Sequence, residues 1–168
     1  MLSRLFDPVR RFREGSGGYQ TFSATIDVWT KKVRNAQNFI FQRTAQRLAH
    51  ELTDEVTRLV YDQPPAPTYP KRTGFLMASL VASNKEMPRL SLDNPDRYVE
   101  MDFGPLELVI NGSDLGDRLY LGYTTKYGGY VHGGSNGQPP KLWVSLVAQR
   151  WRQIVSEVAA EVRKEAGL

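Results

Sequence analysis

The sequence contains no cysteine and only two histidines among its 168 residues. It therefore cannot form a disulfide, bind a metal through thiolates or use a cysteine nucleophile. His50 and His132 are too few and too far apart in the chain to indicate a zinc site. No apolar run approaches the roughly 18 residues that span a bilayer, and the N-terminus lacks the apolar core of a signal peptide. We therefore expect no metal, no cofactor and no membrane contact.

The size and charge of the chain set further limits. A length of 168 residues favours one domain with a sizeable core. The net charge of +4 permits contact with nucleic acid but does not require it. We expect residues 1–18 to form a basic arm with a glycine-rich joint, and residues 19–168 to form a single domain.

The most regular pattern in the sequence predicts a helix from Ser23 to Asp62. Apolar residues recur there at helical spacing, with a threonine in one position: Trp29, Val33, Ala36, Ile40, Thr44, Leu48, Leu52, Val56 and Leu59. Ser23 or Thr25 can cap its start. The prolines that follow Gln63 predict its end.

The length of this helix bears on assembly. At ~1.5 Å per residue, about 38 helical residues would span ~57 Å. A compact chain of this size has a diameter near ~40 Å. The helix must therefore bend, make the molecule elongated or be covered by another chain. Phe39, Phe41 and Ala45 widen its apolar surface beyond one stripe, which favours cover by another chain.

The N-terminal arm is amphipathic and basic. Its apolar residues at helical spacing, Leu2, Leu5, Phe6, Val9 and Phe12, are candidates for docking on a partner protein. Its basic residues, Arg4, Arg10, Arg11 and Arg13, are candidates for contact with DNA phosphate. Residues 15–18, Gly-Ser-Gly-Gly, predict a flexible joint.

The second half of the chain predicts short strands and a final helix. Residues 98–103 and 106–110, followed by Asn111-Gly112, and residues 119–123 predict three strands of one antiparallel sheet. A short apolar element near 75–81 fits either helix or strand. A glycine-rich loop covers 126–138, and Pro139-Pro140 introduces a helix that runs to Glu165 before Gly167. The expected fold class is α+β, with a long N-terminal helix and a C-terminal helix packed on a small antiparallel sheet.

No arrangement of residues predicts catalysis. Ser79 lacks the Gly-x-Ser-x-Gly elbow of a hydrolase nucleophile. Glu100 and Asp102 would share one face of the predicted strand 98–103, where solvation explains them better than metal or acid-base chemistry. His132 could act as a base, although a hydrogen-bonding histidine in a surface loop is commoner. We expect no enzymatic activity.

The order of several short motifs resembles one family. The segment Thr73-Gly74-x-Leu76-x-x-Ser79 precedes the short strands, Tyr127-x-x-Tyr130-Val131-His132-Gly133 follows them, and two prolines introduce the last helix. With the long first helix, this order resembles the tail-completion or neck proteins of long-tailed bacteriophages and tail-like particles over roughly residues 23–165. The basic arm, the longer proline run and His132, where an acidic residue is common, depart from the family pattern.

The resemblance implies a structural role in the virion. Such proteins assemble in the host cytoplasm as rings, here expected to be six- or twelve-fold, between the portal or connector of the DNA-filled head and the tail tube or tail terminator. DNA would pass through transiently, without sequence recognition. The family has no catalytic residues to carry over. Aromatic residues suited to subunit interfaces are Trp29, Phe39, Phe41, Tyr127, Tyr130 and Trp143.

Two alternatives remain open at this point. The first is a nucleic-acid-binding protein without sequence specificity, which would use the arginine-rich arm and the aromatic residues of 120–130. The second is a small hydrolase or nuclease built around His132 with Glu100 and Asp102.

Overall fold

The computed structural model describes residues 16–64, 72–91 and 93–167, with side chains from residue 24 onward. The chain divides into two compact units, Met1–Gln37 and Asn38–Leu168. The predicted arm, with its docking and phosphate-contact candidates at residues 2–13, lies outside the described residues. The expected division into 1–18 and 19–168 stays a prediction.

The long helix, α2, runs from Ser16 to Val56 and continues as a π-helical turn, η1, from Thr57 to Tyr61. Its end agrees with the prediction, but its start at Ser23 or Thr25 was wrong. The predicted flexible joint was wrong for Ser16, Gly17 and Gly18, which form the first turn of α2. A helical glycine costs only about 1 kcal/mol relative to alanine, so two glycines do not end a helix whose apolar spacing continues.

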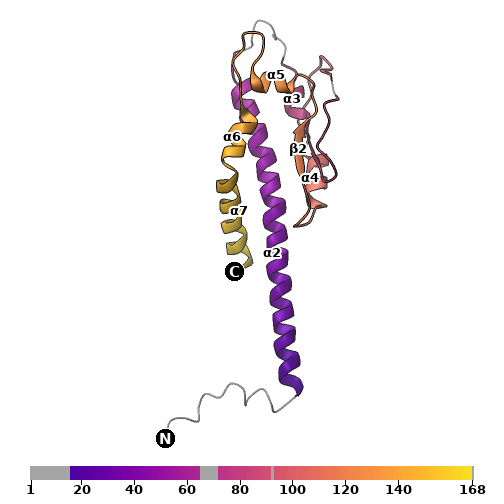
Figure 1. Ribbon diagram of the computed structural model, residues 1–168, viewed down its shortest axis with the longest axis vertical. Coiled ribbons are helices and arrows are strands. Elements are labelled where there is room, and N and C mark those ends of the chain that lie inside the picture. Colours follow the sequence, from indigo (N-terminus) through magenta and orange to yellow (C-terminus); the bar gives the residue numbers. More distant parts are fainter. Residues whose placement is uncertain (1–15, 65–71, 92, 168) are drawn as a thin grey trace. The chain divides into compact units, whose positions relative to one another are not determined.

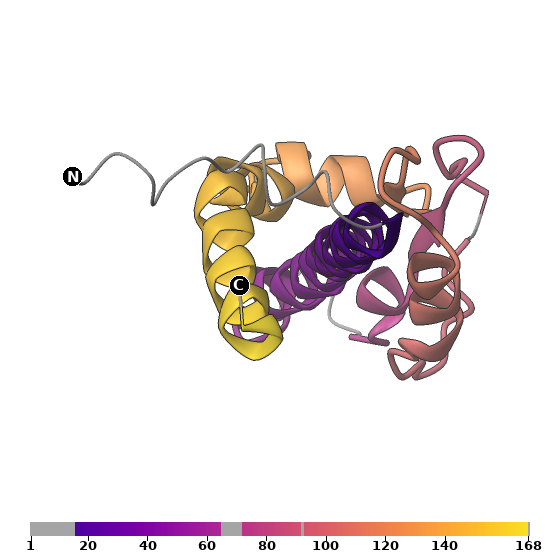
Figure 2. The same ribbon diagram turned by 90° about the horizontal axis from the view of Figure 1, so that it is seen from below.

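Within the second unit, the C-terminal part of α2 lies between two groups of elements. Helices α6, Trp143–Gln149, and α7, Trp151–Ala166, flank one side, while helix α4, Gly104–Asn111, and strand β2, Tyr120–Tyr123, flank the other (Figures 1 and 2). Because two sides of α2 are covered, it buries more than the predicted stripe. Ala45 and Ala49 are buried along with Thr44, Leu52 and Val56.

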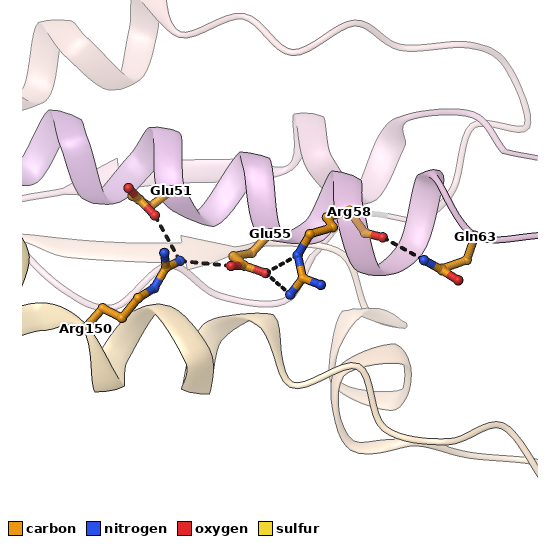
Figure 3. A network of polar contacts seen from close by, with 5 residues as sticks. All are labelled: Glu51, Glu55, Arg58, Gln63 and Arg150. Carbon is orange, nitrogen blue, oxygen red and sulfur yellow. Dashed lines mark hydrogen bonds and ion pairs between the residues drawn. The ribbon is translucent and has the colours of Figure 1, made fainter.

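One row of α2 side chains at four-residue spacing pairs with the C-terminal helices. Arg43 binds Glu165 at 2.8 Å and Arg47 binds Glu161 at 3.3 Å. The order of these pairs makes α7 antiparallel to α2. Farther along, Arg150 bridges Glu51 and Glu55 at 2.9 Å each, as Figure 3 shows. These contacts fix α7 in register against α2.

A second row on α2 faces the α4 side. Asn38 donates from Nδ2 to Asp114 Oδ1 at 2.6 Å. Gln42 donates to the carbonyls of Asn111 and Ser113 at 3.1 and 2.9 Å. One turn on, Gln46 donates to Asn111 Oδ1 at 2.9 Å. Gln42 thus binds one carbonyl in the last turn of α4, where helical carbonyls have no partner within their own helix, and one carbonyl just beyond it.

The sheet is smaller than predicted. Strands β1, Leu80–Ser83, and β2, Tyr120–Tyr123, pair antiparallel, with Leu80 opposite Tyr123. The predicted strand at 98–103 was wrong, because the described chain there forms neither strand nor helix. The fold class was nevertheless confirmed: long and C-terminal helices accompany a small antiparallel sheet in an α+β fold.

The predicted strand at 106–110 was also wrong, because this segment is helix α4. The sequence pattern of this segment fits both a strand and a helix, and the burial of its side chains distinguishes the two. Leu106 and Ile110, one helical turn apart, are buried, while Leu108 between them is 76% exposed. A strand would have placed all three on one face. Pro105 stands in the first turn, where proline favours a helix start.

The remaining elements are short helices and the divided C-terminal helix. Helix α3 is Phe75–Ala78, and α5, Gly128–Gly133, occupies part of the predicted glycine-rich loop. The last helix was predicted to start at the prolines, but α6 begins at Trp143 after Leu142, whose φ is +48°. Helix α7 ends before Gly167, as predicted, and Gly167 has a left-handed conformation.

The Arg150 bridge allows a prediction. We expect Arg150→Ala to lower the free energy of unfolding by about 1 kcal/mol, because the two partly exposed ion pairs and the packing of the side-chain stem are lost together. Chemical denaturation would measure the change. Arg152→Ala, at an exposed position two residues later, is the control and should have a much smaller effect. Equal effects of both substitutions would contradict this role of Arg150.

Candidate functional site

The first motif of the sequence analysis is a tightly packed turn. Gly74 has a φ of +72°, and a Cβ there would lie 2.4 Å from the carbonyl oxygen of Val99. Thr73 accepts a backbone hydrogen bond from Val99 N at 2.7 Å. Ser79 is buried, and its Oγ donates to the Leu76 carbonyl at 2.7 Å. The motif therefore shapes the entry into β1.

The second motif packs directly against the first. It lies on α5, where a Cβ on Gly128 would come within 3.2 Å of Leu76 Cδ1 and 2.9 Å of Thr125 Oγ1. The His132 and Trp143 rings pack edge-on, with 4.9 Å between their centroids. The backbone carbonyl of His132 accepts hydrogen bonds from the backbone N–H groups of Lys141 and Leu142. The two motifs are thus parts of one packed region.

Trp143 belongs to this core. It is 1% exposed, and its ring also meets the ring of Tyr123 at 5.6 Å. The prediction that Trp143 lies at a subunit interface was therefore wrong. The sequence could not distinguish it from Trp29, since both occur in apolar helical stripes. Only the elements packed around it decide which tryptophan is covered within the chain.

A cavity of about 180 Å³ lies beside these motifs, at the end of η1. Tyr61, Leu76 and Tyr127 give it apolar walls, while Arg72 and Lys141 bring positive charge. None of its described lining residues is acidic, so its charge favours an anionic group over a cation. The Arg72 guanidinium donates to the carbonyl of Tyr61, which ties the lining to the helix end.

Burial raises the pKa of the phenols of this region. Desolvation raises the pKa of Tyr127 to about 12 and also raises the pKa of Tyr61. The Tyr61 hydroxyl accepts from Met77 N at 3.3 Å. These tyrosines therefore provide polar, uncharged contacts and do not provide a base at neutral pH.

His132 gives the fold a pH dependence. Burial lowers its pKa below the ordinary 6.5, because the charged form is desolvated. The unfolded chain then binds more protons below pH 6.5, so stability is full above that pH and falls on acidification. We expect the melting temperature to drop between pH 7.5 and 5.5 by more in the native chain than in His132→Gln. Equal drops would contradict this role.

The part of the first unit whose side chains are described, residues 24–37, carries exposed apolar residues on a helix. Ile26, Val28 and Trp29 are exposed, Trp29 to 57%. Ile26 and Trp29 lie on one face of α2, with Val28 beside it and Lys32 one turn beyond. Three basic residues, Lys31, Lys32 and Arg34, stand against one acidic residue, Asp27. We call residues 24–37 the basic helical segment.

Residues 93–117 have the opposite charge and form what we call the acidic segment. Seven acidic residues stand against one basic residue, Arg97: Asp93, Asp96, Glu100, Asp102, Glu107, Asp114 and Asp117. Tyr98, Leu108 and Leu115 are exposed within this segment. Our sequence analysis missed it, although the run of acidic residues is visible in the sequence.

The structure separates the other predicted interface aromatics. Phe39 and Tyr130 are exposed, whereas Phe41 and Tyr127 are half-buried. Glu100 and Asp102 do not share a strand face; Asp102 Oδ1 instead accepts from Gly104 N at 2.9 Å at the start of α4. Across the described ranges, no group of three histidine, aspartate or glutamate side chains is placed to hold a metal.

Comparisons with known proteins add no family assignment. No protein-family model, curated protein or solved structure matches this chain significantly. None of the helices in the described part of the chain combines the length and apolar character that crossing a membrane requires.

Proposed function

We propose that this chain is a structural subunit of the neck of a long-tailed bacteriophage, with no catalytic role. Copies form a ring that joins the portal or connector of the DNA-filled head to the tail, or completes the tail. The ring assembles in the host cytoplasm and remains in the virion. DNA passes through it without sequence recognition.

The observation that carries the proposal is the exposed apolar surface of the basic helical segment. Ile26, Val28 and Trp29 are exposed within one turn of a helix, and a cluster of exposed apolar side chains marks a surface that contacts another protein. Phe39 and Tyr130 add exposed aromatic surface in the second unit. Protein interfaces are enriched in aromatic side chains, so these residues suit contact with other subunits.

The motifs support the proposal in a second way. The segments that carry the resemblance, around Gly74 and Gly128, pack against each other through Leu76. Their residues are used in turns and close packing. Such motif residues maintain the fold, as expected for a structural protein whose surface residues make the contacts with other subunits.

Light scattering of the purified full chain tests the proposal. We expect a mass of six or twelve subunits, either for the chain alone or after addition of a portal or tail-tube protein from the same phage. Measurements at low and high salt, beside a variant lacking residues 1–18, show whether the arm contributes to docking. A monomer at every concentration that ignores these proteins would contradict the proposal, and nucleic-acid binding and nuclease assays would then take precedence.

A further inference from the structure

Two exposed surfaces of this chain are chemically complementary. The basic helical segment, residues 24–37, combines exposed Ile26, Val28 and Trp29 with an excess of two positive charges. The acidic segment, residues 93–117, combines exposed apolar residues with an excess of six negative charges along the chain, one of which, on Asp93, is offset by an ion pair with Lys126 at 3.0 Å. Each surface therefore has apolar area to bury and a charge that selects its partner.

The charges identify the kind of contact that these surfaces can make. Two basic helical segments facing each other would bring like charges together around their apolar faces, which disfavours a symmetric contact. An acidic partner surface removes this repulsion. The chain itself supplies such a surface, and 76% of Leu108 and 74% of Tyr98 are exposed there.

We infer that the basic helical segment of one copy docks on the acidic segment of a second copy. Trp29 and Ile26 cover apolar residues such as Leu108, and Lys31 and Lys32 lie against carboxylates such as Glu100 and Glu107. Because the two surfaces differ, the contact is heterologous, and repeating it closes a ring when the rotation permits. This inference rests on the proposed function and specifies the contact that builds its ring.

Paired charge reversals test the contact on the full chain. The first variant carries Lys31→Glu with Lys32→Glu, and the second carries Glu100→Lys with Glu107→Lys. We expect each variant alone to need about tenfold or more higher concentration than the native chain to assemble, as measured by light scattering. The control, Arg163→Glu with Lys164→Glu, reverses two exposed basic residues on α7 and should assemble like the native chain.

Mixing gives the decisive result. In an equal mixture of the two variants, the reversed positions 31 and 32 of the first variant meet the reversed positions 100 and 107 of the second. The native helix of the second variant meets the native acidic segment of the first, so the charges are opposite at these positions in both contacts. We expect the mixture to regain rings with alternating subunits, which suits an even ring such as six or twelve. In a mixture of the first variant with native chain, we expect rings of native chain alone, without the variant, because its reversed helix meets native carboxylates. Circular dichroism of each variant confirms that it folds.

The outcomes separate this contact from the proposed function. If the native chain forms rings that neither reversal weakens, the contact is wrong while the ring proposal stands. Rescue of the first variant by native chain would point to contact between two basic helical segments and would overturn the inference. The inference would also be overturned if the first variant kept the mass of the native assembly and lost only its binding to duplex DNA. A native chain that never assembles overturns both the ring and the contact.

Discussion

Replacing Trp143 with alanine is expected to lower the free energy of unfolding by about 4 kcal/mol, because it leaves a cavity where a fully buried indole packed. The side chain is 1% exposed and contacts the rings of Tyr123 and His132. Denaturant titration at a concentration where the chain is monomeric would measure the loss. A change below about 1 kcal/mol would show that Trp143 is not part of the core.

Trp29→Ala is the matched control for this experiment. Trp29 is 57% exposed on the basic helical segment, so its removal should change monomer stability by about 0.5 kcal/mol or less. The same substitution should weaken assembly, since tryptophan is often a dominant residue in interfaces. Opposite results for the two tryptophans, with Trp29 controlling stability and Trp143 controlling assembly, would reverse our assignment of core and surface.

Gly74→Ala is expected to destabilise the fold by about 3 kcal/mol, through two separate effects. The backbone φ of +72° is unfavourable for a residue with a side chain, by about 1–2 kcal/mol. The new Cβ would also lie 2.4 Å from the carbonyl oxygen of Val99, so the backbone must shift. Thermal unfolding followed by circular dichroism would report the loss.

Gly129→Ala is a control for this prediction. Gly129 lies in helix α5, where a Cβ would meet nothing within 4 Å. Alanine there should leave stability unchanged or raise it by about 0.5–1 kcal/mol, because alanine favours helix. If both substitutions had the same effect, the close approach of Gly74 to Val99 would not be what requires glycine at position 74.

The helices show which structural features a local sequence pattern can predict. Its end at Asp62 and the stop at Gly167 were predicted, because prolines and glycines act on the backbone where they stand. Its start was misplaced because a glycine only weakens a helix. The segment 106–110 was assigned to the wrong class, because five residues with four apolar positions fit both periodicities.

The exposure of individual apolar residues was harder to predict than the elements. The sequence predicted the same interface role for Trp29 and Trp143, but Trp29 is 57% exposed and Trp143 is 1% exposed. The complementary acidic segment was present in the sequence as summed charge. Its apolar members became visible as exposed only with the structure, since Leu108 lies on the outward face of α4 and Leu106 on the inward face.

The sequence by itself determined the α+β class, the presence of the long helix and the C-terminal ends of the long helix and of the last helix, because periodicity, proline and glycine act through neighbouring residues. It also determined the charges of residues 24–37 and 93–117. The tertiary structure decided which apolar residues are covered, that 106–110 is a helix, and that the Gly74 and Gly128 segments pack together. These outcomes depend on contacts between residues far apart in the chain, whose energies exceed the small local preferences that a sequence pattern records.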